Sequence, residues 1–319
     1  MKLTIEDIQQ AHERIVPYIH CTPILQSAQL NKIFGCELFF KADNFQKVGA
    51  FKARGACNAV FSMDQDSLSK GVITHSSGNH GAALAWAAAM RQTPCTVVMP
   101  DNAPQAKKDA VISYGATVVY CEPTMAAREA TVTNLIAQSG ASLVHAYDDN
   151  RIIAGQGTVA MEILHQHSGT IDAIFIPVGG GGLIAGVAAY VKYVRPETKI
   201  IGVEYEESAC LAAAMAAGRR VTLKQVGIFA DGIAVAQVGE HTWPILKDTV
   251  DEVITVSSDE ICAAVKDIFD DTRVIAEPAG AVGVAGMKKY VERTGCRNKT
   301  LVTISSGANS NFDRLRYVT

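Results

Sequence analysis

Short apolar runs alternate with stretches of helical character along the whole chain. Eight of these runs have the length of β-strands. They are Glu37–Lys41, Gly71–His75, Thr96–Met99, Thr117–Cys121, Ala173–Val178, Lys199–Val203, Glu252–Val256 and Thr300–Ser305. Strands that alternate with helices form parallel sheets that are covered by helices on both faces. The pattern therefore predicts an α/β fold, in which ligand-binding loops lie at the carboxyl ends of the strands.

Polar residues cluster after the predicted strand that ends at His75. The run Ser76–Gly81 contains two hydroxyls, an amide and two glycines, and it opens the alanine-rich helix Ala82–Met90. Helix capping is one interpretation, because Ser, Asn and Gly are favoured at helix starts. The run holds more polar groups than one cap needs, however. It is typical of a loop that points N–H groups and short polar side chains at an anion such as a carboxylate.

Four consecutive glycines, Gly179–Gly182, join the apolar strand Ala173–Val178 to the helical run Leu183–Val194. Because glycine has no Cβ, the backbone can wrap closely around a ligand, which at a strand-to-helix junction is most often a phosphate. A flexible turn is the alternative. The run is not a P-loop, because no Gly-Lys-Ser/Thr follows. It is a poor dinucleotide fingerprint, because the third glycine comes late, at Gly186.

Lys52 stands in an apolar, glycine-flanked segment, Gly49–Ala56. Its neighbours suggest a partly buried amine, and a neutral amine forms Schiff bases with carbonyl groups. A surface lysine at a helix start is the alternative. Ser306, in the polar run Ser305–Asn309 after the last predicted strand, offers a hydroxyl to a ring nitrogen. A Schiff-base lysine, an anion-binding loop and a phosphate cradle together indicate pyridoxal phosphate as the cofactor.

These segments, in this order, resemble the fold-type II pyridoxal-phosphate enzymes, and among them the threonine dehydratase and serine racemase group. The resemblance covers essentially the whole chain. It extends to Asn44–Gln46, Ile153–Thr158, Ala230–Gly232 and Ala276–Gly280. It implies two parallel-sheet α/β domains of the tryptophan synthase β type, with the cofactor between them. The small domain would span residues 48–145, and the large domain would span 1–47 and 146–319.

The resemblance also implies which residues hold the cofactor and the substrate. Lys52 would carry the cofactor as a Schiff base, and Ser306 would face its pyridine nitrogen. Asn79 would hydrogen-bond the 3′-hydroxyl. The other cofactor-binding residues would pack beside the ring or hold the phosphate: Phe51, Gly179, Gly180, Gly181, Gly182 and Leu183. The pocket for the substrate carboxylate would be lined by Ser76, Ser77, Asn79 and His80.

The two halves of the chain resemble different members of this group. The C-terminal half resembles the catalytic domain of biosynthetic threonine dehydratases, as in Gly227–Gly232 and Leu315–Val318, and we expect this catalytic domain without the C-terminal regulatory domain. The N-terminal half resembles eukaryotic-type serine racemases, as in Thr74–Gly81 and Tyr114–Pro123. Ser77 stands where racemases have serine and dehydratases typically have alanine. It could donate the second proton of a racemisation, or it could only bind the carboxylate.

Racemases of this group also bind a divalent cation, through two acidic residues with a carbonyl between them. The resemblance places Glu204 at the first carboxylate, the Ser208 carbonyl at the middle ligand and Cys210 at the second acidic position. Because hard cations prefer oxygen ligands, Cys210 argues against a Mg²⁺ site. A weaker site for a mono- or divalent cation, built from Glu204 and carbonyl groups, is the alternative.

The first functional hypothesis is a dehydratase that converts L-threonine to 2-oxobutanoate and L-serine to pyruvate, each with release of ammonia. The second is an amino-acid racemase that uses Lys52 and Ser77 as its two proton-transfer groups, and one enzyme can catalyse both reactions. Dehydration of hydroxyaspartate is a third option within the same chemistry. A ligand-binding protein on an enzyme scaffold is the non-catalytic alternative.

Composition narrows the partners and the compartment. With 319 residues, 48% of them hydrophobic, the chain can bury a substantial core, and a net charge of −3 gives no indication of nucleic-acid binding. No apolar run reaches membrane-spanning length, and no signal-peptide core follows Met1. The eight cysteines are scattered without a C-x-x-C pair, as free thiols in a reducing cytosol are. We expect a cytoplasmic enzyme for a small amino acid, and the resemblance implies a homodimer or homotetramer.

Overall fold

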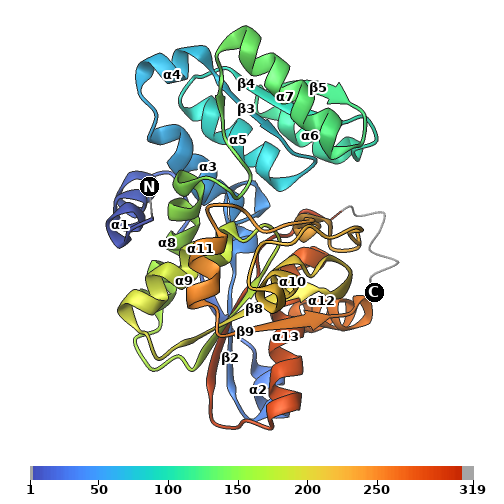
Figure 1. Cartoon of the computed structure of the whole chain (residues 1–319). Coiled ribbons are helices and arrows are strands. Elements are labelled where there is room, and N and C mark those ends of the chain that lie inside the picture. The colour runs from blue at the N-terminus through green and yellow to red at the C-terminus, as the bar shows by residue number, and fades with distance from the viewer. Residues whose placement is uncertain (1–2, 311–319) are drawn as a thin grey trace.

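The computed structural model describes residues 3–310, which form two bodies, each built on its own sheet (Figure 1). The segment Leu315–Val318, which resembles threonine dehydratases, lies outside the described residues. The strands are β1 Ile24–Gln26, β2 Glu37–Lys41, β3 Val72–His75, β4 Cys95–Pro100, β5 Thr117–Cys121, β6 Ser142–Leu143, β7 Ala173–Pro177, β8 Lys199–Tyr205, β9 Glu252–Val256 and β10 Thr300–Ile304.

Helices surround both sheets. The α-helices are α1 Ile5–Ile15, α2 Ala28–Phe34, α3 Lys52–Phe61, α4 Gln65–Lys70, α5 Asn79–Met90, α6 Gln105–Ser113, α7 Met125–Ser139, α8 Asn150–Gln166, α9 Gly182–Val194, α10 Cys210–Ala217, α11 Trp243–Thr249, α12 Ser258–Thr272 and α13 Pro278–Thr294. Short 3₁₀ helices are η1 Asp43–Phe45, η2 Lys47–Gly49, η3 Glu206–Ser208 and η4 Asp231–Ile233.

The larger sheet has the strand order β1-β2-β10-β7-β8-β9 and forms the lower body in Figure 1. Its strands are parallel except at the edge, where β1 pairs antiparallel with β2. Strand β2, near the start of the chain, is the neighbour of β10, the last strand, since Thr300 of β10 pairs with Glu37 of β2. The N-terminal segment is therefore built into the same sheet as the C-terminal strand.

The smaller sheet has the order β5-β4-β3-β6, with every pair parallel, and forms the upper body in Figure 1. It contains no strand from outside residues 72–143 within the part of the chain that the structure describes. The domain limits at 47/48 and 145/146 stay a prediction. The separation of the two sheets along the chain is consistent with that prediction.

Alternating side chains of the central strand β7 show why both faces of the large sheet need helices. Ile174 and Ile176 are fully buried in the core that includes residues of α8 and α9. Phe175, between them, is fully buried in the core that includes residues of α12 and α13. Since successive side chains of a strand point to opposite faces, each face has its own apolar layer. An uninterrupted apolar strand of this kind is typical of a sheet covered on both sides.

The helices of the large body begin and end with ordinary local signals. The Ser257 hydroxyl accepts a hydrogen bond from the Glu260 N–H, and the Glu260 carboxylate accepts one from the Ser257 N–H, so that α12 starts with a capping box. Helix α13 starts with Pro278 at its first position and ends at Gly295, which has a left-handed φ of 62°. The residues at these helix ends therefore favour the helix boundaries that the fold has.

The predicted α/β fold with parallel sheets is confirmed, and each of the eight predicted strands overlaps an observed one. The sequence pattern missed β1 and β6, which have three and two residues. So short a strand has no detectable alternation, and its position depends on the neighbour that it pairs with. Within residues 3–310, none of the helices has both the length and the apolar character that crossing a membrane requires.

Candidate active site

A cavity of about 150 Å³ lies between the two bodies, at the carboxyl ends of β3, β7 and β10. The Lys52 segment, the Ser76–Gly81 loop, the Gly179–Gly182 loop and Ser306 all reach it, although they come from distant parts of the chain. Its lining is formed by Phe51, Lys52, Ser76, Ser77, Gly78, Asn79, His80, Lys107, Ala146, Tyr147, Pro177, Gly179, Gly180, Gly181, Gly182, Leu183, Asp231, Gly232, Ile233, Val235, Glu277, Ala279 and Ser306. The structure thus brings together every predicted cofactor- and substrate-binding residue.

Lys52 is the first residue of α3, and its amine points into the cavity. Nζ donates a hydrogen bond to the Ala146 carbonyl at 2.7 Å and lies 5.1 Å from the centre of the Phe51 ring. Burial lowers the pKa of Lys52 to about 8, and the nearby Glu277 carboxylate opposes this shift. A substantial fraction of the amine is therefore neutral near physiological pH, which is the form that attacks a carbonyl carbon.

The glycine loop is shaped so that side chains would not fit. A Cβ on Gly180 would lie under 3.0 Å from the ring of Tyr147, and one on Gly182 would lie 3.0 Å from the Tyr147 Cα. Gly181, at the start of α9, has a left-handed φ of 95°. No side chain caps α9, so its first N–H groups face the cavity without such a partner. This backbone can hold an anion such as a phosphate.

The loop before α5 offers a second anion-binding surface. Helix α5 begins after Gly78 without a side-chain cap, so the capping interpretation of the Ser76 and Ser77 hydroxyls does not apply. The Ser76 Oγ instead accepts a hydrogen bond from the Gly78 N–H at 3.3 Å. Both serines are half-buried and line the cavity. The loop can therefore present hydroxyls and the first α5 amides to a carboxylate.

His80 is buried at the same helix start. Its Nε2 lies 3.0 Å from the Val144 carbonyl, and because a carbonyl only accepts, Nε2 carries the proton. Burial, together with the positive charge of Lys52, lowers the pKa of His80 to about 3. The ring is therefore uncharged, and its Nδ1 has no hydrogen-bond partner among the described residues. The predicted contact of His80 with the substrate carboxylate stays a prediction.

Glu277 joins the site from the start of α13. Its Oε1 accepts a hydrogen bond from Asn79 Nδ2 at 2.7 Å, and Asn79 Oδ1 accepts one from Asn309 Nδ2 at 2.9 Å. Both ends of the Asn79 amide are therefore fixed. Burial, with help from Asp231, raises the pKa of Glu277 to about 7. Ser306, 4% exposed, lies beside this group and donates a long hydrogen bond, 3.4 Å, to the Ala279 carbonyl.

Lys107 and Asp231 form an ion pair that links the two bodies at the cavity. Lys107 belongs to α6 of the upper body, and Asp231 begins η4 of the lower body. The carboxylate is half exposed, at 53%, so the pair lies where the cavity opens to solvent. The pair can therefore hold the two bodies together over a bound ligand.

The predicted cation ligands lie outside the cavity lining. Glu204 is fully buried, and its two oxygens accept hydrogen bonds from the Leu211 and Ala212 N–H groups at 2.7 and 2.8 Å. Burial raises the pKa of Glu204 to about 7. Ser208 is buried as well. Within residues 3–310 no group of three or more His, Cys, Asp or Glu side chains could hold a metal ion, and the cation site remains a prediction.

Comparison with known proteins identifies the family. Residues 15–307 match the family described as "Pyridoxal-phosphate dependent enzyme". The chain belongs to this family. Pyridoxal phosphate is accordingly its cofactor, and the predicted resemblance to fold-type II enzymes is confirmed.

The relatives of this pyridoxal-phosphate enzyme include proteins named as dehydratases and proteins named as racemases. The chain is 49% identical to the biosynthetic L-threonine dehydratase of Burkholderia multivorans over 284 residues, 88% of this chain and 56% of the relative. It thus spans little more than half of that relative. It is 44% identical to the serine racemase of Arabidopsis thaliana over 314 residues, 98% of this chain and 94% of the relative.

Among solved structures, the serine racemase of Dictyostelium discoideum superposes with a TM-score of 0.90 at 41% identity. It covers 97% of this chain and 99% of its own. Dehydratases and racemases are similar to this chain at comparable sequence identity. The comparisons therefore place the chain in the dehydratase and racemase group of pyridoxal-phosphate enzymes, without deciding between the two reactions.

The residues of the cavity fit this cofactor. The amine of Lys52 can bond to an aldehyde carbon, since its pKa is about 8. The loop Gly179–Gly182 lines the cavity and has no side chains, so its backbone N–H groups are open to a phosphate. Ser306 lines the cavity, and its uncharged hydroxyl would face the ring nitrogen. These are the residues that would hold the cofactor.

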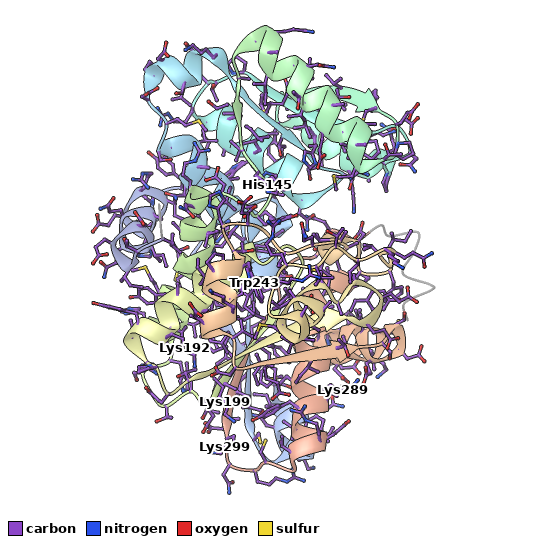
Figure 2. All side chains as sticks on the ribbon, in the orientation of Figure 1. His145, Lys192, Lys199, Trp243, Lys289 and Lys299 are labelled. Atoms are coloured by element: carbon purple, nitrogen blue, oxygen red, sulfur yellow. The ribbon has the colours of Figure 1, made fainter. Side chains whose placement is uncertain are left out.

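Among the lining residues that were not predicted site residues, four have side chains that can titrate: Lys107, Tyr147, Asp231 and Glu277. Asp231 and Glu277 lie in the segments Ala230–Gly232 and Ala276–Gly280, which resemble the family, and this resemblance could have indicated that they belong to the site. Tyr147 follows His145, which lies where the two bodies meet in Figure 2, and their rings pack edge to face at 4.6 Å. Lys107 lies in none of the motifs or family-like segments of the sequence.

Proposed function

We propose that this protein is a pyridoxal-phosphate-dependent hydroxy-amino-acid dehydratase. It would convert L-threonine to 2-oxobutanoate and ammonia, and L-serine to pyruvate and ammonia. The observation that carries the proposal is the position of Lys52, whose amine, with a pKa lowered to about 8, lies in one cavity with two anion-binding loops. When bound, pyridoxal phosphate withdraws electrons from the amino-acid Cα and makes its proton acidic.

Lys52 acts as the base that removes the Cα proton. The Ala146 carbonyl, 2.7 Å from Nζ, orients the amine within the cavity. The amine is neutral often enough near pH 7 to accept a proton, because burial disfavours its charge. Glu277 stabilises the ammonium that forms, through its negative charge. One lysine thus serves as nucleophile toward the cofactor and as base toward the substrate.

Ser306 favours elimination over return of the proton. Its hydroxyl carries no charge and therefore does not hold a proton on the ring nitrogen, so the cofactor is a weaker electron sink than it would be beside a carboxylate. Negative charge at Cα is then poorly dispersed, and expulsion of the β-hydroxyl relieves it. The phosphate held by Gly179–Gly182 would be the acid for that leaving group.

The substrate carboxylate would bind to the loop before α5. The Ser76 and Ser77 hydroxyls and the first N–H groups of α5 face the same cavity as Lys52. The carboxylate would therefore fix the Cα proton toward the amine. The ion pair between Lys107 and Asp231 would keep water out while the reaction proceeds.

A serine racemase is the second candidate, and Ser77 is the observation that favours it. Ser77 lines the cavity together with Lys52, and a racemase needs a proton donor on the face of the substrate opposite its base. Substitution Ser77→Ala separates the two roles. Loss of racemisation with survival of elimination from L-serine makes Ser77 the proton donor, whereas equal loss of both makes it a binding residue.

A paired product assay tests the proposal. Purified protein is incubated with L-threonine, L-serine or hydroxyaspartate, and ketoacid and D-amino acid are quantified in the same samples. We expect ketoacid, more from threonine, and none from the Lys52→Ala variant. D-serine at a rate comparable to pyruvate would instead make the protein a racemase with a side elimination. Turnover retained by Lys52→Ala would contradict both candidates.

A further inference from the structure

Two cysteines meet at the end of the large sheet that lies away from the cavity. Cys36 directly precedes β2, and Cys296 lies between α13 and β10. Their Sγ atoms are 4.0 Å apart, although the residues are separated by 260 positions in the chain. The Cys36 thiol donates a hydrogen bond to the Cys296 carbonyl at 3.4 Å. The two side chains therefore face each other.

Backbone hydrogen bonds hold the two segments together on either side of Cys36. The Asn298 N–H donates to the Gly35 carbonyl at 2.7 Å, and the Glu37 N–H donates to the Lys299 carbonyl at 2.8 Å. Since a disulfide has a sulfur–sulfur distance of about 2.05 Å, the sulfurs need to approach by roughly 2 Å. Rotation of the side chains with a small movement of the two loops can supply that approach.

The two thiols differ in their exposure to solvent. Cys36 is 4% exposed, and burial raises the pKa of its thiol, so that Cys36 is a poor first nucleophile. Cys296 is only partly buried and precedes Arg297, whose guanidinium donates to the Cys296 carbonyl at 2.9 Å. Because Cys296 is the more exposed of the two thiols, it is the one that an oxidant meets first.

We propose that Cys36 and Cys296 are a reversible oxidation site, which forms a disulfide with a small-molecule disulfide such as oxidised glutathione. The Cys296 thiolate attacks one sulfur of the oxidant and releases one reduced thiol. Cys36, as a thiolate, then attacks the Cys296 Sγ and releases the second reduced thiol. The protein loses two electrons and two protons in total, and the oxidant gains both.

The disulfide would act on stability and not on the cavity. Cys36 and Cys296 lie at the starts of β2 and β10, whereas the cavity lies at the carboxyl ends of the strands. Figure 2 shows this separation, because Lys299 lies at the lower end of the lower body and His145 lies between the two bodies. A cross-link that closes so long a loop lowers the conformational entropy of the unfolded chain, and this stabilises the folded state relative to the unfolded one.

Peptide mapping without reduction tests the proposal. The full chain, loaded with cofactor, is incubated with oxidised glutathione and digested. We expect one cross-linked pair of peptides that joins Cys36 to Cys296, and an upward shift in Tm that dithiothreitol reverses. The variant Cys36→Ser should lose both effects and leave Cys296 bound to glutathione. The variant Cys262→Ser, which changes another partly buried thiol, should keep both effects.

Three results would overturn the proposal: both cysteines unmodified after oxidation, Cys296 bound to glutathione in the unsubstituted chain, or either cysteine cross-linked to a different partner. The peptide map requires no turnover. Its outcome is therefore independent of whether the protein is a dehydratase.

Discussion

Lys52 illustrates how burial sets the chemistry of a single side chain. An exposed lysine is almost entirely charged at neutral pH, whereas removal of its amine from water disfavours the ammonium. The cavity lowers the pKa of Lys52 to about 8 although a carboxylate, Glu277, acts in the opposite direction. Desolvation is thus the stronger of the two effects. The reactivity of this residue follows from where α3 begins.

The pKa of Lys52 predicts how fast the protein captures its cofactor at different pH values. Only the neutral amine attacks the aldehyde of pyridoxal phosphate, so for protein stripped of cofactor the capture rate should rise about tenfold per pH unit below about pH 8 and level off above it. The growth of the visible absorption band after mixing measures this rate. Lys52→Ala is the control without a band. A rate that is constant between about pH 6 and pH 9 would contradict the assignment.

At the scale of single elements, buried charges connect α3 to the large body. Arg54, two residues after Lys52, lies 2.7 Å from Asp43 and 2.6 Å from Glu162 of α8, and Lys41 of β2 lies 2.6 Å from the same Glu162. All four side chains are at most 5% exposed. Each charge has an opposite partner, so the network fixes the start of α3 without an unpaired buried charge.

Removal of one partner should therefore be costly. We expect Arg54→Met to destabilise the protein by about 3–5 kcal/mol, because Asp43 would remain buried without its ion-pair partner and Glu162 would keep only Lys41. Urea denaturation measures the change in the free energy of unfolding. The matched variant Lys70→Met breaks an exposed ion pair with Asp66, which water already screens, and should change the stability much less. A similar decrease in the free energy of unfolding in both variants would mean that the buried network contributes no more to stability than an exposed ion pair.

The glycine loop between β7 and α9 is the second element on which the site depends. A Cβ at position 180 would lie under 3.0 Å from the ring of Tyr147, so that the ring or the loop would have to shift. We expect Gly180→Ala to weaken pyridoxal-phosphate binding at least about tenfold, or roughly 1.4 kcal/mol, because the cradle would open. Titration of stripped protein with the cofactor, followed by absorbance, measures the change in Kd.

Gly218→Ala is the control for this substitution. Gly218 has a left-handed φ of 64°, but a Cβ there would meet nothing within 4 Å. We expect a stability loss of roughly 1 kcal/mol from backbone strain and an unchanged Kd for the cofactor. A Kd that is unchanged in Gly180→Ala as well would show that the loop does not hold the phosphate.

At the scale of the whole molecule, the site exists only because two bodies meet. Lys52 and the glycine loop face each other across the cavity, and the ion pair of Lys107 with Asp231 connects the bodies where the cavity opens. We infer that this pair favours the closed arrangement and that closure excludes water. Whether copies of the chain associate as a dimer or tetramer, and in which compartment, remain predictions from the resemblance and the composition.

Loss of the ion pair between Lys107 and Asp231 should weaken substrate binding. We expect Lys107→Ala to raise the KM for L-threonine several-fold, because the closed state would be less populated. Lys108→Ala is the matched control, since Lys108 donates to the Asp101 carbonyl within the upper body. Steady-state kinetics with both variants measure the difference. Equal KM values in the two variants would exclude a role of the pair in closure.

The sequence by itself determined the fold class, the eight main strands and the cofactor. Short apolar runs between helical stretches and the absence of side chains in Gly179–Gly182 are local properties, which need no knowledge of distant partners. The order of the motifs then identified the family, which residues 15–307 confirm. The roles of Lys52, Ser77 and Ser306 are still predictions, because they depend on a bound cofactor and substrate.

Only the tertiary structure decided which distant residues touch. Glu277 and Asn79 are 198 positions apart, and Lys107 and Asp231 are 124 apart, yet each pair is in contact at the cavity. The antiparallel edge strand β1 likewise depends on its neighbour, since three residues have no periodicity of their own. Such contacts follow from how the helices pack the two sheets together. Packing is a property of the whole chain, and a local pattern does not contain it.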